Sequence, residues 1–179
     1  MIPIKDKIIK ARPTLKTKLG VTNDLAAPRL VKVVVSSGTG KLREAKRQEL
    51  VADRLTKITG QRAAPRGSKK SVASFKVRQG EVIGHMVTLR GARMYDFLDR
   101  LLNIAIPRTR DFRGYDDKSV DEVGNLTIGV REHSVFPETA DEDLKDVFGL
   151  AVTIVTTAKS RAEALDFFHS IGFPFKKGK

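Results

Sequence analysis

Alternating apolar and polar residues predict several β-strands along this chain. In the segment 85–90, Val87 and Leu89 fall on one side, while Thr88 and Arg90 fall on the other. The segment 30–35 is rich in β-branched valine, which is typical of a buried strand. Together these patterns predict strands over 30–35, 61–66, 85–90, 126–130 and 150–157.

Apolar residues spaced three and four apart predict helices between these strands. Gly20 and Gly60 are expected to end two of them, since glycine readily adopts the left-handed conformation at a helix C-terminus. Pro107 is expected to end a third. Ser160 and Glu163 form a capping box that begins the last helix. The predicted helices cover 2–19, 41–59, 94–105 and 160–171.

The order of these elements predicts an α+β fold in one continuous domain over residues 1–179. Strands and helices alternate without strict βαβ regularity, so we expect a mainly antiparallel sheet with helices packed on one face. The other face is then open, and it carries Thr88 and Arg90. A long basic loop over 67–83 is expected to protrude from the domain.

Composition narrows the choice of partners. The net charge is +13 and the sequence pI is about 10.2, which favours RNA, DNA or an anionic membrane. The chain has no cysteine, which excludes disulfides and thiolate metal sites. Its N-terminus has charges every few residues, so we expect no signal peptide. No run approaches the roughly 20 apolar residues that a membrane span needs, so we expect no span and a cytoplasmic location.

The strongest charge feature is the segment 62–80, which holds six cations and no acid. Such a surface repels itself unless a polyanion neutralises it, and nucleic acid phosphate is the common polyanion. Phe75 is the only large apolar side chain near its middle. The alternative interpretation is a solvated, partly mobile loop without a partner.

Sites for enzymatic chemistry do not emerge from the sequence. The segment 36–41 resembles a phosphate-binding loop, but Val35 and Leu42 replace the Gly and Ser or Thr that the motif needs. We therefore interpret its glycines as a tight turn that needs glycine dihedral angles. The three histidines have no metal-site spacing, and the acidic cluster 141–143 is typical of a helix start or a solvated turn. We expect no catalytic residue, metal, cofactor or small-molecule substrate.

A second basic loop, 108–114, supplies three arginines and one aromatic ring. Arg108, Arg110 and Arg113 can make forked contacts with phosphate, and Phe112 can stack on a base. The residues equally allow an internal network in which Asp111 pairs with an arginine and Phe112 packs inward.

Six segments taken together resemble the bacterial form of the large-subunit ribosomal protein L-five family. They occur in the family's order, and the resemblance runs from about Pro28 to Phe175. Six ordered motifs over most of a chain are far more specific than any one of them. The segments are Ile58-Thr-Gly-Gln61, Lys69-Lys-Ser-Val-Ala-Ser-Phe-Lys-Val-Arg78, Val87-Thr-Leu-Arg-Gly91, Met94-Tyr-Asp-Phe-Leu-Asp-Arg100, Ile106-Pro-Arg-Thr-Arg-Asp-Phe-Arg-Gly114 and Ile154-Val-Thr-Thr-Ala-Lys159.

The resemblance implies a non-enzymatic protein of the ribosome's central protuberance. Members of the family bind 5S rRNA on the open face of the sheet and its margins. They contact the P-site tRNA and help form a bridge through small-subunit ribosomal protein thirteen. The expected partners are therefore 5S rRNA, 23S rRNA, P-site tRNA, that small-subunit protein and neighbouring large-subunit proteins.

The resemblance also implies a set of RNA-binding residues. Gln61 and Thr88 stand where the family hydrogen-bonds to rRNA, with Arg90 on the same face. Ser36 stands where the family usually has Asn; serine is shorter, so this contact could be water-mediated or lost. The basic loop is expected to position the elbow of the P-site tRNA without reading its sequence. Its contact residues would be Lys69, Lys70, Ser71, Lys76 and Arg78.

Two other functions are compatible with some of these residues. A general RNA-binding protein explains the charge but not the ordered motifs. A phosphate-transferring enzyme would rest on the segment 38–41 and needs residues that are absent.

A mobile basic loop would suit a contact with tRNA that is made and broken in each elongation cycle.

Overall fold

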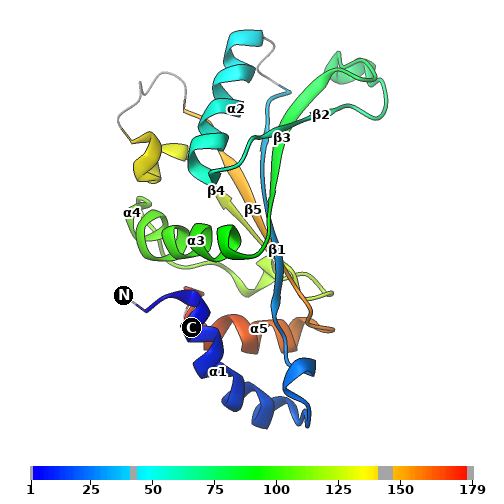
Figure 1. The fold of residues 1–179 in the computed structure, drawn as a ribbon. Coiled ribbons are helices and arrows are strands. Elements are labelled where there is room, and N and C mark those ends of the chain that lie inside the picture. Colours follow the sequence, from blue (N-terminus) through cyan, green and yellow to red (C-terminus); the bar gives the residue numbers. More distant parts are fainter. Residues whose placement is uncertain (1, 41–43, 141–146, 177–179) are drawn as a thin grey trace. The chain divides into compact units, whose positions relative to one another are not determined.

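The computed structural model describes residues 2–40, 44–140 and 147–176. Within these residues a five-stranded sheet has the strand order β2-β3-β1-β5-β4 (Figure 1). The strands are β1 (Leu30–Gly38), β2 (Ala64–Gly67), β3 (Val82–Leu89), β4 (Leu126–Val130) and β5 (Leu150–Thr156). The helices are α1 (Ile4–Leu19), α2 (Ala45–Thr59), α3 (Ala92–Arg100), α4 (Ile106–Arg108) and α5 (Arg161–Ser170).

The fold is α+β with an antiparallel sheet, as the sequence predicted. Ala64 of β2 lies opposite Met86 of β3, and Pro65 lies opposite His85. In β5, four alternating residues are buried and the three between them are half-exposed. Such alternation indicates that one face of the sheet is covered and the other meets solvent.

The chain divides into two compact units. Unit 1 comprises Met1–Val33, Arg90–Ile128 and Thr153–Lys179, and unit 2 comprises Val34–Leu89 and Gly129–Val152. In unit 1, α1 packs against α5 and α3. Its core combines aliphatic residues with aromatic side chains from the helices, of which Phe97, Phe167 and Phe168 are fully buried. In unit 2, α2 packs against β3, and Val51, Leu55 and Ile58 form the buried face of that helix.

Several predicted helix boundaries are confirmed. Gly20 and Gly60 adopt left-handed conformations, with φ of 63° and 67°, and end α1 and α2. The Ser160 side chain accepts a hydrogen bond from the Glu163 amide at 3.3 Å, which caps α5. Glu163 in turn accepts the amide of Lys159 at 2.9 Å. Strand β4 covers the residues predicted for it.

The turn predicted for residues 36–40 does not begin at Ser36, and of these five residues only Gly40 lies in a turn. Strand β1 continues through Gly38, and the Thr39 amide donates to the Ile83 carbonyl at 2.8 Å. Neither Gly38 nor Gly40 has a positive φ, so no glycine dihedral angle is required at either position. The sheet extends the strand because β3 and β5 flank β1 and pair with its backbone.

Other predicted boundaries shift, and one prediction falls outside the described residues. Helical structure passes through Pro107 by way of a π-helical turn over Leu101–Ala105 and ends at Arg108. A π turn is one of the ways a helix can accommodate a local irregularity. Helix α2 begins at Ala45, after the extended residue Glu44, and so starts later than the predicted residue 41. The acidic cluster 141–143 lies outside the described residues.

A buried imidazole makes the stability of this fold depend on pH. Burial lowers the pKa of His85 below its usual value of about 6.5. Its Nδ1 has no hydrogen-bond partner within the described part of the chain. The unfolded chain takes up a proton near pH 6.5 and the folded chain does so only at lower pH. Stability is therefore expected to fall as the pH drops below about 6.5.

We expect His85→Phe to remove much of this dependence, as measured by urea unfolding between neutral and mildly acidic pH. Phenylalanine keeps a ring of similar size and has no group to protonate there. The matched variant His169→Phe replaces an exposed imidazole and should retain the wild-type trend. Equal pH dependence in wild type and His85→Phe would show that His85 does not carry the effect.

Candidate nucleic-acid interface

Unit 2 brings together Gln61 and Thr88, two of the predicted rRNA-binding residues. The Gln61 amide Nε2 donates a hydrogen bond to the Thr88 carbonyl at 3.3 Å. Both residues are half-exposed, whereas Val87 and Leu89 on either side of Thr88 are buried. The Thr88 side chain therefore lies on the solvent face of β3, as the alternation predicted.

The end of α2 positions Gln61. Gly60 ends the helix in the left-handed conformation, and its amide donates to the Thr56 carbonyl. The Thr59 hydroxyl lies 3.1 Å from the Gln61 carbonyl and 2.6 Å from the Leu55 carbonyl, so it can donate to either. These contacts hold the backbone of Gln61, while its side-chain carbonyl is left to accept a hydrogen bond from a ligand.

Ser36 lies on β1, next to β3 in the sheet. It is half-exposed between the buried residues Val35 and Ser37, so it shares the solvent face. Within the described part of the chain, no hydrogen bond occupies the hydroxyl of Ser36 or that of Thr88. Arg90, the remaining residue of the predicted set, is exposed and follows β3 directly, but it belongs to unit 1.

The basic loop is an internally hydrogen-bonded extension of the β2–β3 hairpin (Figure 1). The Gly80 amide donates to the Ser68 carbonyl, and the Ser68 amide donates to the Glu81 carbonyl, both at 2.9 Å. Farther out, Val72 and Val77 exchange two backbone hydrogen bonds of 3.0 and 3.2 Å. Backbone hydrogen bonds therefore join the two arms of the loop at its base and near its tip, and the expected mobility of this loop stays a prediction.

The side chains of the loop point away from any core. Lys69, Lys70, Lys76 and Arg78 are all exposed, and so is Ser71, whose hydroxyl accepts the Gln79 amide at 3.0 Å. The Phe75 side chain is 73% exposed, which confirms that the loop builds no core of its own. The sequence did not reveal that Val72 and Val77 would pair beside this ring.

One acid lies at the base of this cationic surface. The Glu81 carboxylate accepts the Arg78 amide at 3.0 Å, and the segment 62–80 itself carries none. The cations are exposed on one hairpin, where their fields add and attract a polyanion.

The loop over 108–114 in unit 1 has features of both interpretations that the sequence left open. Arg108, Arg110 and Arg113 are exposed, and no ion pair joins Asp111 to them among the described residues. Phe112 instead packs edge-on against Tyr115, with ring centroids 5.1 Å apart. The arginines are thus presented to solvent, whereas the aromatic ring is used within the fold.

The C-terminal segment supports this second loop. The Tyr115 amide donates to the Pro174 carbonyl at 2.9 Å, and the Lys176 amide donates to the Tyr115 carbonyl at 2.8 Å. Burial raises the pKa of Tyr115 above its usual value. Gly114 sits between the exposed arginines and this support, with a φ of 92°.

Other kinds of site find little support in the described ranges. No three His, Asp or Glu side chains there gather in a way that could hold a metal ion. No helix in the same ranges is long and apolar enough to cross a membrane. The missing motif residues already argued against a phosphate-binding loop over 36–41, of which Ser36 to Gly38 are part of β1 and Lys41 lies outside the described residues.

Comparison with known proteins identifies the family. A family model described as ribosomal protein L5 matches residues 23–78, and a second model, described as the C-terminus of the same ribosomal family, matches residues 82–175. The protein named large ribosomal subunit protein uL5 from Desulforamulus reducens is 44% identical over 179 residues, covering 99% of both chains.

Two further relatives carry the same name. The protein from Desulfotalea psychrophila is 46% identical over 92% of this chain and 93% of its own. The one from Halothermothrix orenii is 45% identical over 97% of this chain and 96% of its own. The chain therefore belongs to the ribosomal protein L5 family and is an RNA-binding protein of the large ribosomal subunit, not an enzyme.

Proposed function

We propose that this protein binds 5S rRNA through the solvent face of its sheet, within the central protuberance of the large subunit. The observation that carries the proposal is the pairing of Gln61 with Thr88 on that face. The two half-exposed side chains offer a carbonyl and a hydroxyl to an incoming ligand. A hydroxyl and an amide can both donate to and accept from base edges, ribose or phosphate.

The other residues of the proposed rRNA site have supporting roles. Ser36 offers a hydroxyl on the neighbouring strand, and its short side chain suits a contact through a bridging water. Arg90 adds a cation that can fork onto phosphate. A phosphate contact by Arg90 would increase the affinity for RNA, whereas contacts by Gln61 and Thr88 would contribute to the choice of RNA.

The basic loop is proposed to contact the P-site tRNA. Its exposed cations lie along a hairpin that projects from the sheet, which suits phosphate contacts on a large RNA. Contacts to phosphate carry no sequence information, and a protein that must accept every tRNA needs contacts of this kind. Lys69, Lys70, Ser71, Lys76 and Arg78 are the proposed contact residues.

The exposed arginines of the 108–114 loop are proposed to contact 23S rRNA or the bridge to the small subunit. Arg108, Arg110 and Arg113 present three guanidinium groups from one short segment, backed by Phe112 on Tyr115. The bridge partner would be small-subunit ribosomal protein thirteen, with neighbouring large-subunit proteins beside it.

Binding titrations against 5S rRNA and a size-matched unrelated RNA test the first proposal. The wild type is expected to prefer 5S rRNA, and Gln61→Ala combined with Thr88→Ala is expected to reduce that preference at least about tenfold. The slope of log affinity against log salt should change little, because neither residue is charged. The matched control is Thr14→Ala combined with Gln79→Ala, which removes exposed side chains of the same types.

Two results would contradict the proposal. Equal affinity of the wild type for both RNAs would leave a general RNA-binding protein whose affinity comes from charge alone. An undiminished 5S preference in the double variant would move the recognition site away from this face. Thermal unfolding of each variant separates lost binding from lost folding.

A further inference from the structure

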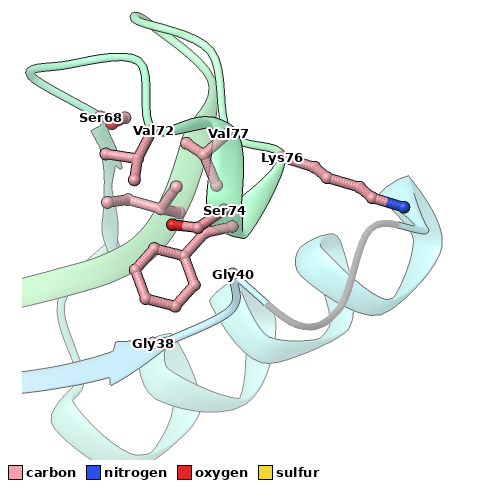
Figure 2. A pocket seen from close by; sticks show the side chains of 9 residues that line it. Gly38, Gly40, Ser68, Val72, Ser74, Lys76 and Val77 are labelled. Atoms are coloured by element: carbon pink, nitrogen blue, oxygen red, sulfur yellow. The ribbon is translucent and has the colours of Figure 1, made fainter.

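An apolar hollow opens at the inner side of the basic loop, in unit 2. Its volume is about 840 Å³, within the range of about 300–1,000 Å³ that is typical of sites for small ligands. The lining includes Val72, Phe75, Val77, Ile83, Gly38 and Gly40. Figure 2 shows the side chains of Val72 and Val77 together on one side, with Gly38 and Gly40 on the other.

The two glycines in this lining are not required by the fold. Neither has a positive φ, and a Cβ added at either position would have no atom within 4 Å. Glycine in a strand, as at Gly38, loses conformational entropy and contributes no packing, so its presence there often marks a place where a ligand approaches closely. Here the absent side chains leave the hollow open.

The apolar part of the lining is unusually accessible for its size. The Val72 and Ile83 side chains are 40% and 36% exposed, and Phe75 is more exposed than either. Exposed apolar residues that line one hollow indicate a binding surface more strongly than scattered ones do. Phe75 thus presents a large part of its ring to an incoming group.

The surroundings of the hollow select the chemistry of its occupant. Lys69, Lys70 and Arg78 belong to the same hairpin and are exposed, and the segment 62–80 has no acid. The Lys76 side chain extends away from the other lining residues (Figure 2). A flat apolar group with negatively charged groups attached could stack on the Phe75 ring while the cations bind its charges. An unpaired nucleobase with its flanking phosphates has this combination.

We propose that the hollow binds one unpaired nucleobase of an RNA, stacked on Phe75, while the neighbouring cations hold the flanking phosphates. The inference rests on the proposed RNA contact of the basic loop and adds to it a site for a base. It is separate from the Gln61 and Thr88 site, which lies on the face of the sheet. The site tolerates any base, because stacking does not read hydrogen-bonding edges.

The test compares a short fully paired RNA duplex with the same duplex carrying one unpaired adenine. We expect the wild type to prefer the duplex with the unpaired adenine by at least about fivefold, the lower range for one base stacked on an aromatic ring. Phe75→Ala removes the ring, and Gly38→Val fills the hollow from the opposite side; each should abolish the preference. Phe75→Tyr keeps an aromatic face and should retain it.

A second readout locates the base. The methyl resonances of Val72, Val77 and Ile83 should shift when the duplex with the unpaired adenine is added and stay in place with the paired one. The variant Gln61→Ala with Thr88→Ala should keep the preference, so the pocket is tested independently of 5S selectivity. Equal affinity for the two duplexes would overturn the inference, even if both bind with the expected salt dependence. A preference that only the Gln61 and Thr88 variant loses would overturn it too.

Discussion

Replacing Gly114 with alanine is expected to destabilise the protein by at least about 3 kcal/mol. Gly114 has a φ of 92°, a conformation that alanine adopts only with strain. An added Cβ would also lie 2.7 Å from the Lys176 amide nitrogen and 2.7 Å from the Phe175 carbonyl carbon. Both are backbone atoms, so relief requires that the C-terminal segment move away from Tyr115. Urea unfolding should show a lower midpoint with an unchanged slope.

Gly129→Ala is the matched control for this change. Gly129 lies in β4 without a positive φ, and an added Cβ there has no atom within 4 Å. Alanine at such a position is expected to be neutral or to stabilise by about 0.4–1 kcal/mol. Equal unfolding midpoints for the two variants would show that the C-terminal segment does not hold Gly114 as described.

Neutralising the four cations of the basic loop is expected to have the largest effect on RNA binding. Changing Lys69, Lys70, Lys76 and Arg78 to Gln removes up to four phosphate contacts. The slope of log affinity against log salt should then become shallower by about 0.7–0.9 per lost contact. Affinity for tRNA should fall more than about tenfold at low salt, as measured by titration at several salt concentrations.

The control for this variant carries the same net charge. Gln at four exposed lysines elsewhere, namely Lys46, Lys57, Lys118 and Lys159, lowers the charge of the chain equally. If binding depends on the position of the cations, this control should keep most of the wild-type salt slope. A slope that falls equally in both variants would show that overall charge, not the loop, attracts the RNA.

Much of the fold could be predicted from residues whose local preference and tertiary setting agree. Gly20 and Gly60 end their helices because the left-handed conformation suits glycine in any context. The side of β3 that carries Thr88 could be predicted because Val87 and Leu89 must both be buried. In each case one short stretch of sequence contains the whole cause.

The predicted element boundaries were wrong where contacts with a neighbouring element determine the local structure. Residues 36–38 have the composition of a turn, yet they continue β1 because β3 and β5 pair on either side. Pro107 did not end its helix because a π turn precedes it. The apolar hollow could not be foreseen, since it joins Gly38 to Phe75, residues far apart in the sequence.

The hydrogen-bond ladder of the basic loop affects how long a bound RNA stays. Because Val72 pairs with Val77 and Ser68 pairs with Gly80, an arriving RNA meets a hairpin that already makes part of its own backbone hydrogen bonds. Binding then requires little further loss of chain entropy, so association is governed by diffusion and electrostatic attraction. Release requires that the phosphate contacts and the stacked base separate, without a need to break the hydrogen bonds of the loop. The residence time of the RNA should therefore shorten steeply as salt rises.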